Sequence, residues 1–413
     1  MRAVNFDLFR IFIVCLALQF SMPDLATAQR FTFPGKRKSQ NISFDLVRNL
    51  VIVPLYINEK GPYHFILDTG VSPMIITDST ILQDLSLQKL RQVKISGLGK
   101  GLDLDALLSN QITARIGKAS IQNIPTAILK EDVLGLSNYV GTRIYGLIGY
   151  HFFNSFVAEI NYTGRQLKFW LPGRHQKIKG EPVPIEILNG KPYTTVKVNM
   201  PDQESLAVKV VIDNGASHAI SLETLHDQPF PLPPHSISAN LGIGLGGPIS
   251  GNIGRIPSIT IGTFNLENVI SSYPIYDDAA AKALLLNRNG NLGAEVLSRF
   301  NVTFDYNNDL MYLRRNANYK RPFNHDMSGL EVYVEEKPLK RYFVGRVEPD
   351  SPASEAGLEI GDEILTINFI NATALDLNDF TRYLRSENGK TLYLSINRLG
   401  DLLIKTIKLK KRI

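Results

Sequence analysis

Two aspartates with matching surroundings are the residues of this chain best placed to do chemistry. Asp68 ends an apolar run and opens the triplet Asp-Thr-Gly, and Asp213, 145 residues later, ends a second apolar run and opens Asp-Asn-Gly. An apolar strand before each aspartate would hold its backbone rigidly, and the glycine would let another backbone approach. Two carboxyl groups in contact cannot both ionise, so they share one proton. The ionised member can take a proton from water while the other donates to a carbonyl oxygen, which is general acid–base hydrolysis without a covalent intermediate.

The two aspartate motifs belong to a longer internal repeat. A glycine-rich stretch begins 29 residues after each aspartate, at Gly97 and at Gly242, and the sequence GLIG at 146–149 recurs as GNLG at 290–293. Self-similarity at this length predicts two related lobes, because the repeats of solenoid proteins are far shorter. The units are short, rich in β-branched residues and divided by Gly and Pro, which indicates a mainly β fold. A polar segment rich in Pro and Gly at 171–184 is the expected joint between the lobes.

Simpler interpretations of these motifs stay open. Asp-Thr-Gly after a strand is often only a turn in which the aspartate bonds to the local backbone. The glycine-rich stretches can be hairpin turns without contact to a substrate, and they lack the Gly-Lys-Ser/Thr ending of a phosphate-binding loop. The sequence has no G-x-S-x-G motif of a serine hydrolase. The histidines His64, His151 and His218 lack the spacing of metal ligands, so no metal site is predicted.

With these motifs the chain resembles the aspartic proteases of the retropepsin and pepsin clan, over roughly residues 44–316. The two Asp-x-Gly triplets, the glycine-rich stretches and the apolar-apolar-Gly segments carry the resemblance. It implies a duplicated, two-lobed β-barrel in which Asp68 and Asp213 meet at the lobe interface as the catalytic pair. It also implies that no cofactor is needed beyond water.

The resemblance further implies which residues surround the pair. The residues implied to support the catalytic pair are Thr69, Gly70, Asn214 and Gly215. The glycine-rich stretches would be flap hairpins over the substrate. Their substrate-binding glycines would be Gly97, Gly99, Gly101, Gly242, Gly244 and Gly246.

Three positions depart from the family pattern. Asn214 stands where the family carries Thr or Ser, whose hydroxyl bonds to the backbone of the other lobe, although an amide can also donate and accept. Val71 is bulkier than the usual Ser or Ala after the glycine, and Asn291 interrupts the apolar segment of the second lobe. None of the three removes a carboxylate. The alternative to an active protease is therefore a catalytically degenerate, peptide-binding scaffold of the same fold.

A second resemblance covers the C-terminal segment, from about residue 327 to 413. The stretches that carry it are VEPDSPASEAGL at 347–358 and GDEILTIN at 361–368. They resemble a PDZ domain of the kind associated with bacterial proteases. Ser351 before Pro352 is typical of a helix start, DEILTIN alternates as a strand does, and Asp376 with Asp379 can cap the helix that follows.

A PDZ domain binds an extended peptide by adding it as a strand to a sheet edge beside a helix, and loop amides receive the terminal carboxylate. The resemblance implies that this loop precedes the strand at 343–347. The residues implied to contact the peptide are Arg341, Tyr342, Phe343 and Val344. The usual Gly-Leu-Gly-Phe loop is replaced here by KRYFVG. A PDZ fold used only for docking, or as a lid on the protease, is the alternative.

The N-terminus has the features of a secretory signal peptide. Arg2 and Arg10 flank the start of the segment, an apolar run follows at 11–20, and Ala-Thr-Ala at 26–28 suits cleavage. The rival interpretation is an uncleaved anchor helix, but the run is short for a membrane span and no later segment is long and apolar enough. Cys15 is the single cysteine among 413 residues, so a mature chain would use neither disulfides nor thiol catalysis. The net charge of +6 is spread thinly, and no nucleic-acid partner is expected.

Together these features predict an exported, single-chain aspartic endopeptidase of mainly β fold with a C-terminal α+β PDZ domain. The expected location is secreted or periplasmic, and the expected partners are a peptide or protein substrate and the C-termini of other proteins. The expected divisions are a signal peptide at 1–28, lobe 1 at 29–180, lobe 2 at 181–320 and the PDZ domain at 327–413. A structural envelope protein, whose barrels only position the PDZ domain, is a further alternative.

Overall fold

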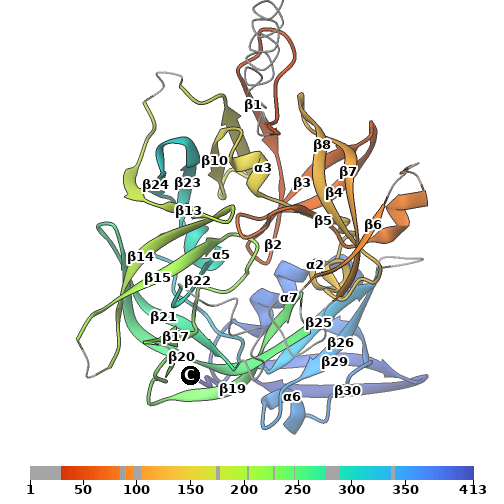
Figure 1. The fold of residues 1–413 in the computed structure, drawn as a ribbon. Helices are drawn as coiled ribbons and strands as arrows, with labels where there is room; N and C mark the ends of the chain where they lie inside the picture. Colours follow the sequence, from red (N-terminus) through yellow and green to blue (C-terminus); the bar gives the residue numbers. More distant parts are fainter. Residues whose placement is uncertain are drawn as a thin grey trace, which may run out of the picture.

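The fold is mainly β, as the sequence predicts (Figure 1). The computed structural model describes residues 29–413, apart from 84, 86, 88–89, 96–103, 174–176, 202–203, 227, 246, 276–287 and 336–339. The predicted signal peptide at 1–28 lies outside the described residues. The residues that are described form four large β-sheets and one two-stranded sheet.

The first large sheet, with the short helices beside it, forms lobe 1 and carries Asp68 directly after its third strand. In spatial order its strands are β2 (Asp45–Val47), β3 (Leu50–Ile57), β4 (Lys60–Leu67), β9 (Gly146–Ile148), β5 (Met74–Ile76), β8 (Ala119–Leu129), β7 (Leu104–Ile116) and β6 (Arg91–Ile95). Its helices are η1 (Ser79–Gln83), α2 (Leu136–Val140) and α3 (Tyr150–Phe153). β3 also pairs with β7, through Tyr56 opposite Arg115, so the sheet curls round on itself.

Lobe 2 repeats the strand order of lobe 1 and carries Asp213 at the end of its third strand. In spatial order its strands are β13 (Glu186–Leu188), β14 (Lys191–Asn199), β15 (Leu206–Asp213), β22 (Gly290–Gly293), β16 (Ile220–Leu222), β21 (Phe264–Pro274), β20 (Gly247–Ile261) and β19 (Ser236–Gly244). Helix α5 (Ala294–Leu297) follows β22, and β17 (Thr224–Leu225) and β18 (Gln228–Pro229) form the small sheet. β14 pairs with β20 as β3 does with β7.

A third sheet joins the two lobes through continuous backbone pairing. Its order is β1 (Ser39–Ser43), β11 (Gln166–Trp170), β10 (Val157–Asn161), β23 (Phe300–Asp305), β24 (Leu310–Arg315) and β12 (Glu181–Pro184), and η2 (Tyr306–Asn308) connects β23 to β24. β10 of the first half runs antiparallel to β23 of the second, with Ile160 opposite Val302. This six-stranded sheet therefore fixes the position of one lobe relative to the other.

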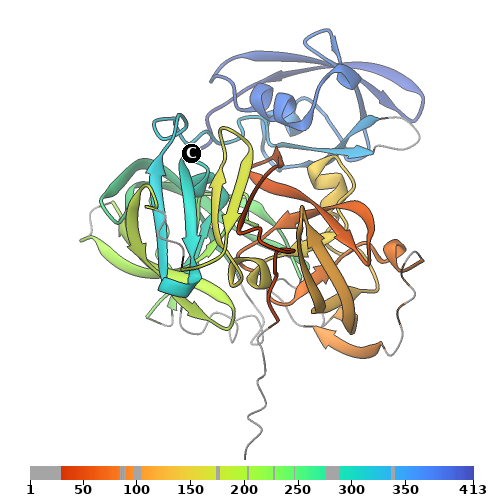
Figure 2. The same cartoon turned by 90° about the horizontal axis from the view of Figure 1, so that it is seen from above.

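The fourth sheet lies at the C-terminal end of the chain and crosses the end of both lobes (Figure 2). Its main path is β25 (Leu330–Glu335), β26 (Arg341–Val347), β27 (Glu363–Ile367), β29 (Thr391–Arg398) and β30 (Asp401–Lys408), and β28 (Ile370–Asn371) pairs with β27. Its helices are α6 (Pro352–Glu355), η3 (Ala372–Ala374) and α7 (Leu377–Leu384). It has its own apolar core, separate from the core shared by the lobes.

Local sequence accounts for the ends of these helices. Ser351 Oγ accepts a hydrogen bond from the Ser354 N–H at the start of α6, as the Ser-Pro pair predicts. Asp376 and Asp379 form a capping box at the start of α7, each carboxylate accepting from the other residue's N–H. Each such cap satisfies main-chain donors that the first helical turn leaves unpaired.

The core of the two lobes is continuous across their junction. Phe153 of α3 packs edge-on against Phe304 of β23 at a centroid separation of 5.1 Å and stacks on Tyr306 at 5.7 Å. All three side chains are buried, and they come from opposite halves of the chain. Burial of one such aromatic ring stabilises both lobes at once.

We expect Phe153→Ala to lower the free energy of unfolding by about 3–5 kcal/mol, because it removes a buried ring and leaves a cavity. Urea unfolding followed by tryptophan fluorescence measures the change. Phe369→Ala is the matched control, because Phe369 is 84% exposed and should change the free energy by less than about 1 kcal/mol. Equal effects of the two substitutions would show that the junction adds little to stability.

Candidate active site

The structure brings Asp68 and Asp213 together at the lobe interface. A methyl group placed on Gly215 would lie 2.2 Å from Asp68 Cγ, and one placed on Gly70 would lie 3.0 Å from Asp213 Cγ. At Gly215 only glycine leaves room for the opposite carboxyl group, and at Gly70 a side chain would press tightly against it. Each aspartate also accepts a hydrogen bond at Oδ1 from the N–H two residues on, at 2.7 Å from Gly70 and 2.9 Å from Gly215.

Thr69 and Asn214 form hydrogen bonds with each other across the lobe interface, beneath the two carboxyl groups. Thr69 N–H donates to Asn214 Oδ1 at 2.7 Å, and Asn214 N–H donates to Thr69 Oγ1 at 3.1 Å. Thr69 Oγ1 then donates to the carbonyl of Ile212 at 2.7 Å, and Asn214 Nδ2 donates to the carbonyl of Leu67 at 2.9 Å. Both side chains are fully buried. The asparagine thus makes both types of bond that a hydroxyl would make, since an amide can donate and accept.

The GLIG and GNLG segments lie directly behind the two aspartates. β9 runs parallel to β4, and β22 runs parallel to β15. A methyl group on Gly149 would lie 1.9 Å from the carbonyl oxygen of Asp68, and one on Gly293 would lie 2.1 Å from that of His218. Such close approach of two backbones requires glycine, so these segments hold the aspartate loops from behind.

Asn291 breaks the symmetry of the pair, in a way that the sequence does not reveal. Its side chain points at the dyad, and Nδ2 donates to Asp213 Oδ2 at 2.7 Å. The sequence suggests a defect in the apolar segment at this position, whereas the structure shows a direct contact to a carboxylate. The corresponding position of lobe 1 carries Leu147, which offers no donor. Asp213 therefore accepts a hydrogen bond from a side chain of its own lobe, whereas the corresponding residue of lobe 1 cannot donate one to Asp68.

Only part of the predicted flaps can be placed. Gly242 and Gly244 lie near the tip of the β19–β20 hairpin, and Gly242 has a left-handed φ of +119° beside a break in the strand register. Leu245 at this tip packs against an apolar cluster of lobe 1, as Val71 does, so the hairpin of lobe 2 contacts lobe 1. The remaining predicted flap glycines, Gly97, Gly99, Gly101 and Gly246, lie outside the described residues.

The predicted peptide contacts of the C-terminal domain need correction. β26, which holds Arg341, Tyr342, Phe343 and Val344, is paired with β25 on one side and β27 on the other. A peptide cannot be added to a strand whose two edges are both occupied. Tyr342 and Val344 are also buried in the domain core. The edge that lies beside α7 belongs instead to β25, and the loop before it is at 326–329.

Comparison with known families agrees with this architecture. Residues 53–152 match the aspartyl protease family. Residues 343–398 match the PDZ domain family. A search of curated proteins found no match to the chain. The protease match covers Asp68 but ends before Asp213, whose place opposite Asp68 is shown by the geometry alone.

Burial sets the electrostatics of the protease pair. Asp68 is only 7% exposed, and burial raises the pKa of its carboxyl well above the ordinary value. The charge of Asp213 and a hydrogen bond that the protonated Asp68 carboxyl donates to it raise this pKa further, while the Gly70 N–H acts in the opposite direction. Asp68 therefore holds a proton more tightly than an exposed aspartate does.

Several buried polar groups surround the protease pair in lobe 2. Burial lowers the pKa of His218, which lies next to Asn291, although the charge of Asp213 acts in the opposite direction. Tyr306 has a buried hydroxyl, and burial together with both aspartates raises its pKa well above the ordinary value. No local sequence motif marks either residue for catalysis.

Among the residues that the structure describes, no group of three His, Cys, Asp or Glu side chains is arranged to hold a metal ion. None of the helices described is long and apolar enough to cross a membrane.

We expect Asn214→Ala to lower the free energy of unfolding by at least about 2 kcal/mol, because it leaves the Thr69 N–H and the Leu67 carbonyl buried without partners. Asn214→Thr should lose less, since a hydroxyl can both accept and donate. Thermal and urea unfolding measure the series. The exposed Asn324→Ala is the control, and a wild-type stability for Asn214→Ala would contradict any role of the crossing bonds.

The raised pKa of Asp68 predicts how stability depends on pH. The folded protein binds this proton more tightly than the unfolded chain, so the stabilisation is full below the ordinary aspartate pKa and is lost as pH rises through the raised value. Asp68→Asn keeps a neutral side chain and should not show this loss. Its free energy of unfolding relative to wild type should therefore rise by up to about 1.4 kcal/mol per pH unit within that window.

Urea unfolding at a series of pH values measures this difference. The control is Asp309→Asn, which changes an exposed aspartate and should give a nearly constant difference. A constant difference for Asp68→Asn as well would show that its carboxyl ionises as it does in the unfolded chain.

Proposed function

We propose that the protein is an exported aspartic endopeptidase. The observation that carries the proposal is the buried contact between Asp68 and Asp213, which four crossing hydrogen bonds of Thr69 and Asn214 hold in place. Two carboxyl groups that share a proton can act as acid and base on the same substrate. The aspartyl protease match over 53–152 supports this reading.

The asymmetry of the pair suggests a role for each carboxyl group. Asp68, with its raised pKa, carries the shared proton and donates it to the oxygen of the scissile carbonyl. Asp213, which accepts hydrogen bonds from Gly215 N and Asn291 Nδ2, is the carboxylate that takes a proton from the attacking water. The water oxygen bonds to the carbonyl carbon and a tetrahedral diol forms. Its collapse breaks the C–N bond as Asp213 gives its proton to the leaving amine, and Asp68 takes back a proton from a diol hydroxyl.

The surroundings of the pair suit an extended peptide substrate. The β19–β20 hairpin reaches lobe 1 with its tip residue Leu245, so a segment held under it lies close to both lobes. A PDZ domain in the same chain supports peptide or protein partners. The leader predicted at 1–28 supports export to the periplasm or the medium, where the chain would work without disulfides.

We expect the full chain to cleave a pooled library of unstructured fluorogenic peptides. Asp68→Asn and Asp213→Asn should each lower kcat/KM by at least about 10²–10⁴-fold, because each removes one proton-transfer step. The wild-type rate should fall on both sides of a pH optimum, since the pair must hold one proton. Asp309→Asn, on the surface, should cleave as wild type does.

Equal cleavage by wild type and both site variants would assign the activity to a contaminant. If no cleavage occurs across the pH range but a statine-type transition-state mimic still binds, the protein is a peptide-binding scaffold of the same fold. If neither cleavage nor binding occurs, the barrels only position the PDZ domain.

A further inference from the structure

The peptide groove of the PDZ domain lies between β25 and α7. β25 pairs with β26 along one edge, and α7 packs beside it with Leu377, Phe380 and Leu384 turned into the domain core. A peptide added as a strand would run along the remaining edge of β25 and press its side chains against α7. Its terminal carboxylate would meet the amides of the loop that precedes β25.

The turn between β2 and β3 of lobe 1 reaches into this groove. Arg48 and Asn49 form the turn, with left-handed φ values of +49° and +68°. Arg48 Nη2 donates to the carbonyl of Val332 in β25 at 2.8 Å, and its guanidinium lies 3.7 Å from Glu331. A side chain of lobe 1 thus uses a main-chain acceptor of the strand that would pair with a peptide.

The other wall of the groove binds the same turn. Asn378 of α7 accepts a hydrogen bond at Oδ1 from the Arg48 N–H at 3.3 Å, and its Nδ2 donates to the carbonyl of Leu46 at 3.4 Å. Val47, between these two residues, packs against the apolar core of the PDZ domain. The backbone of residues 46–48 is therefore held at α7, in the space beside β25 where a peptide would lie.

Helix α2 fills the groove further along. A methyl group on Gly141, just after α2, would lie 2.8 Å from Leu377 Cδ1 of α7 and 3.1 Å from Val334 Cγ2 of β25. The backbone at Gly141 thus touches both walls of the groove at once. A strand added to β25 could not pass this point without moving α2.

The loop before β25 already holds a carboxylate of the chain itself. Asp326 accepts hydrogen bonds from the N–H groups of Ser328 at 3.2 Å and Gly329 at 2.5 Å, and from Ser328 Oγ at 2.7 Å. These amides stand where loop amides receive the terminal carboxylate of a PDZ ligand. The Asp326 side chain takes the place that a C-terminal carboxylate would need.

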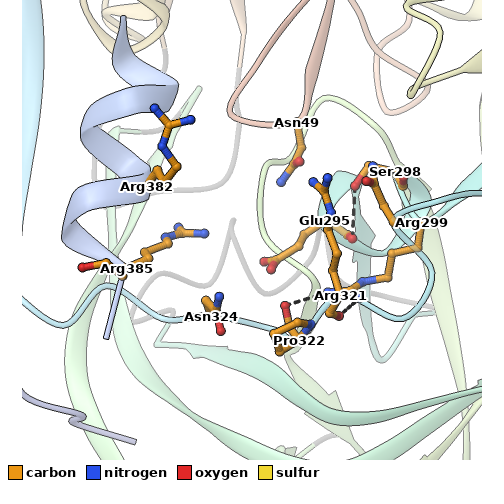
Figure 3. A pocket seen from close by; sticks show the side chains of 11 residues that line it. Asn49, Glu295, Ser298, Arg299, Arg321, Pro322, Asn324, Arg382 and Arg385 are labelled. Atoms are coloured by element: carbon orange, nitrogen blue, oxygen red, sulfur yellow. Dashed lines mark hydrogen bonds between the residues drawn. The ribbon is translucent and has the colours of Figure 1, made fainter. Parts of the chain in front are cut away.

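Space remains on both sides of the inserted turn. A cavity of about 360 Å³ lies between the start of β25, α7 and the β19–β20 hairpin, and Arg48, Asn49 and Arg385 are among its walls. A second cavity of about 490 Å³ lies beyond the C-terminal end of α7. Figure 3 shows Asn49 and Glu295 on one side of this second cavity and Arg385, beside α7, on the other. Asn49 of the turn lines both cavities, and so does Arg385.

The inserted segment is also tied to the active site. The guanidinium of Arg48 lies 4.3 Å from the ring centroid of Tyr139 in α2, and the Tyr139 hydroxyl shares a hydrogen bond of 2.8 Å with Ser217 Oγ. Ser217 is three residues after Asn214. On the other side, the Asn240 N–H of β19 donates to Glu348 of the PDZ domain at 3.4 Å. The PDZ domain thus contacts the flap hairpin of lobe 2 directly, and Arg48 and Tyr139 of lobe 1 connect it to the loop of one catalytic aspartate.

We propose that the PDZ domain is self-ligated in the resting protein: residues 46–48 and α2 fill its peptide groove, Asp326 fills its carboxylate loop, and an external C-terminal peptide must displace them to bind. The apparent affinity for such a peptide is then the intrinsic affinity reduced by the fraction of molecules with an open groove. Release of α2 also removes the Arg48–Tyr139 contact and loosens the Ser217 bond. A bound peptide therefore alters the protease site, a consequence that rests on the proposed function.

Peptide binding to the full chain tests the proposal. The probes are fluorescein-labelled octapeptides ending in Leu, Val, Ile or Phe with a free carboxylate, measured by fluorescence anisotropy in an Asp68→Asn background that does not consume them. Arg48→Glu places a negative charge beside Glu331 and should lower the Kd at least tenfold. Arg165→Glu is the matched control, because Arg165 is exposed and also sits in a turn with a φ of +49°; its Kd should equal that of the parent.

A second variant and a second readout guard against a poorly folded protein or an unsuitable probe. Asp326→Ala should tighten binding of the free acids but leave that of their amidated forms unchanged. Hydrogen exchange at the amides of 328–335 should be at least tenfold faster in Arg48→Glu than in the parent, with unchanged exchange in β10. Equal exchange and equal Kd in the parent and Arg48→Glu would overturn the occupancy of the groove. If hydrogen exchange is faster in Arg48→Glu but no probe binds, the inserted segments do not compete with external peptides, and that part of the proposal is wrong.

The effect of the groove on catalysis is measured in a separate experiment, with proteins that keep both Asp68 and Asp213. Arg48→Glu should change kcat/KM for the fluorogenic peptides at least threefold, and a saturating C-terminal peptide should produce the same change in wild type. No cleavage by any protein would refute the proposed function and leave the binding result standing. Cleavage that is unaffected by Arg48→Glu, with tighter peptide binding, would refute the coupling alone.

Discussion

Two carboxyl groups held together away from water are the constraint on which the structure depends. Bringing Asp68 beside Asp213 costs desolvation and repulsion, and the raised pKa of Asp68 is the sign of that cost. The surrounding fold must therefore hold the pair by other interactions. The crossing bonds of Thr69 and Asn214, both fully buried, do so through main-chain groups of both lobes. The shared sheet and the Phe153 contact then fix the lobes that carry these bonds.

The two halves are equivalent in topology but not in chemistry. Both large sheets follow the same strand order, and both aspartates accept a bond from the N–H two residues on. The differences lie in single side chains: Asn291 in lobe 2 donates to its aspartate, whereas Leu147 in lobe 1 cannot. A repeat with one polar substitution is sufficient to give two similar carboxyl groups different partners. Different partners are what separates an acid from a base in a pair of this kind.

The elements that could be predicted from the sequence are those marked by a local motif or by the internal repeat. The repeat of Asp-x-Gly placed both aspartates, and the Ser-Pro and Asp-x-x-Asp patterns placed the starts of α6 and α7. Features that depend on contacts between distant segments of the chain could not be predicted in this way. From the sequence, Asn291 is interpreted as a break in an apolar segment, and only the sheet shows that it lies beside Asp213. Arg341–Val344 are predicted to form the edge that binds a peptide, but β25 covers that edge. Nothing in the residues around Arg48 indicates that their partners lie some 285–330 positions further along the chain.

The shared six-stranded sheet limits how a substrate can enter. β10 and β23 exchange backbone hydrogen bonds directly, so the lobes cannot swing apart like a hinge without breaking a sheet in its middle. The β19–β20 hairpin is attached to the PDZ domain through the hydrogen bond from the Asn240 N–H to Glu348. The shared sheet is therefore a rigid floor for the two lobes, and the C-terminal domain is placed where it can restrain the hairpin of lobe 2.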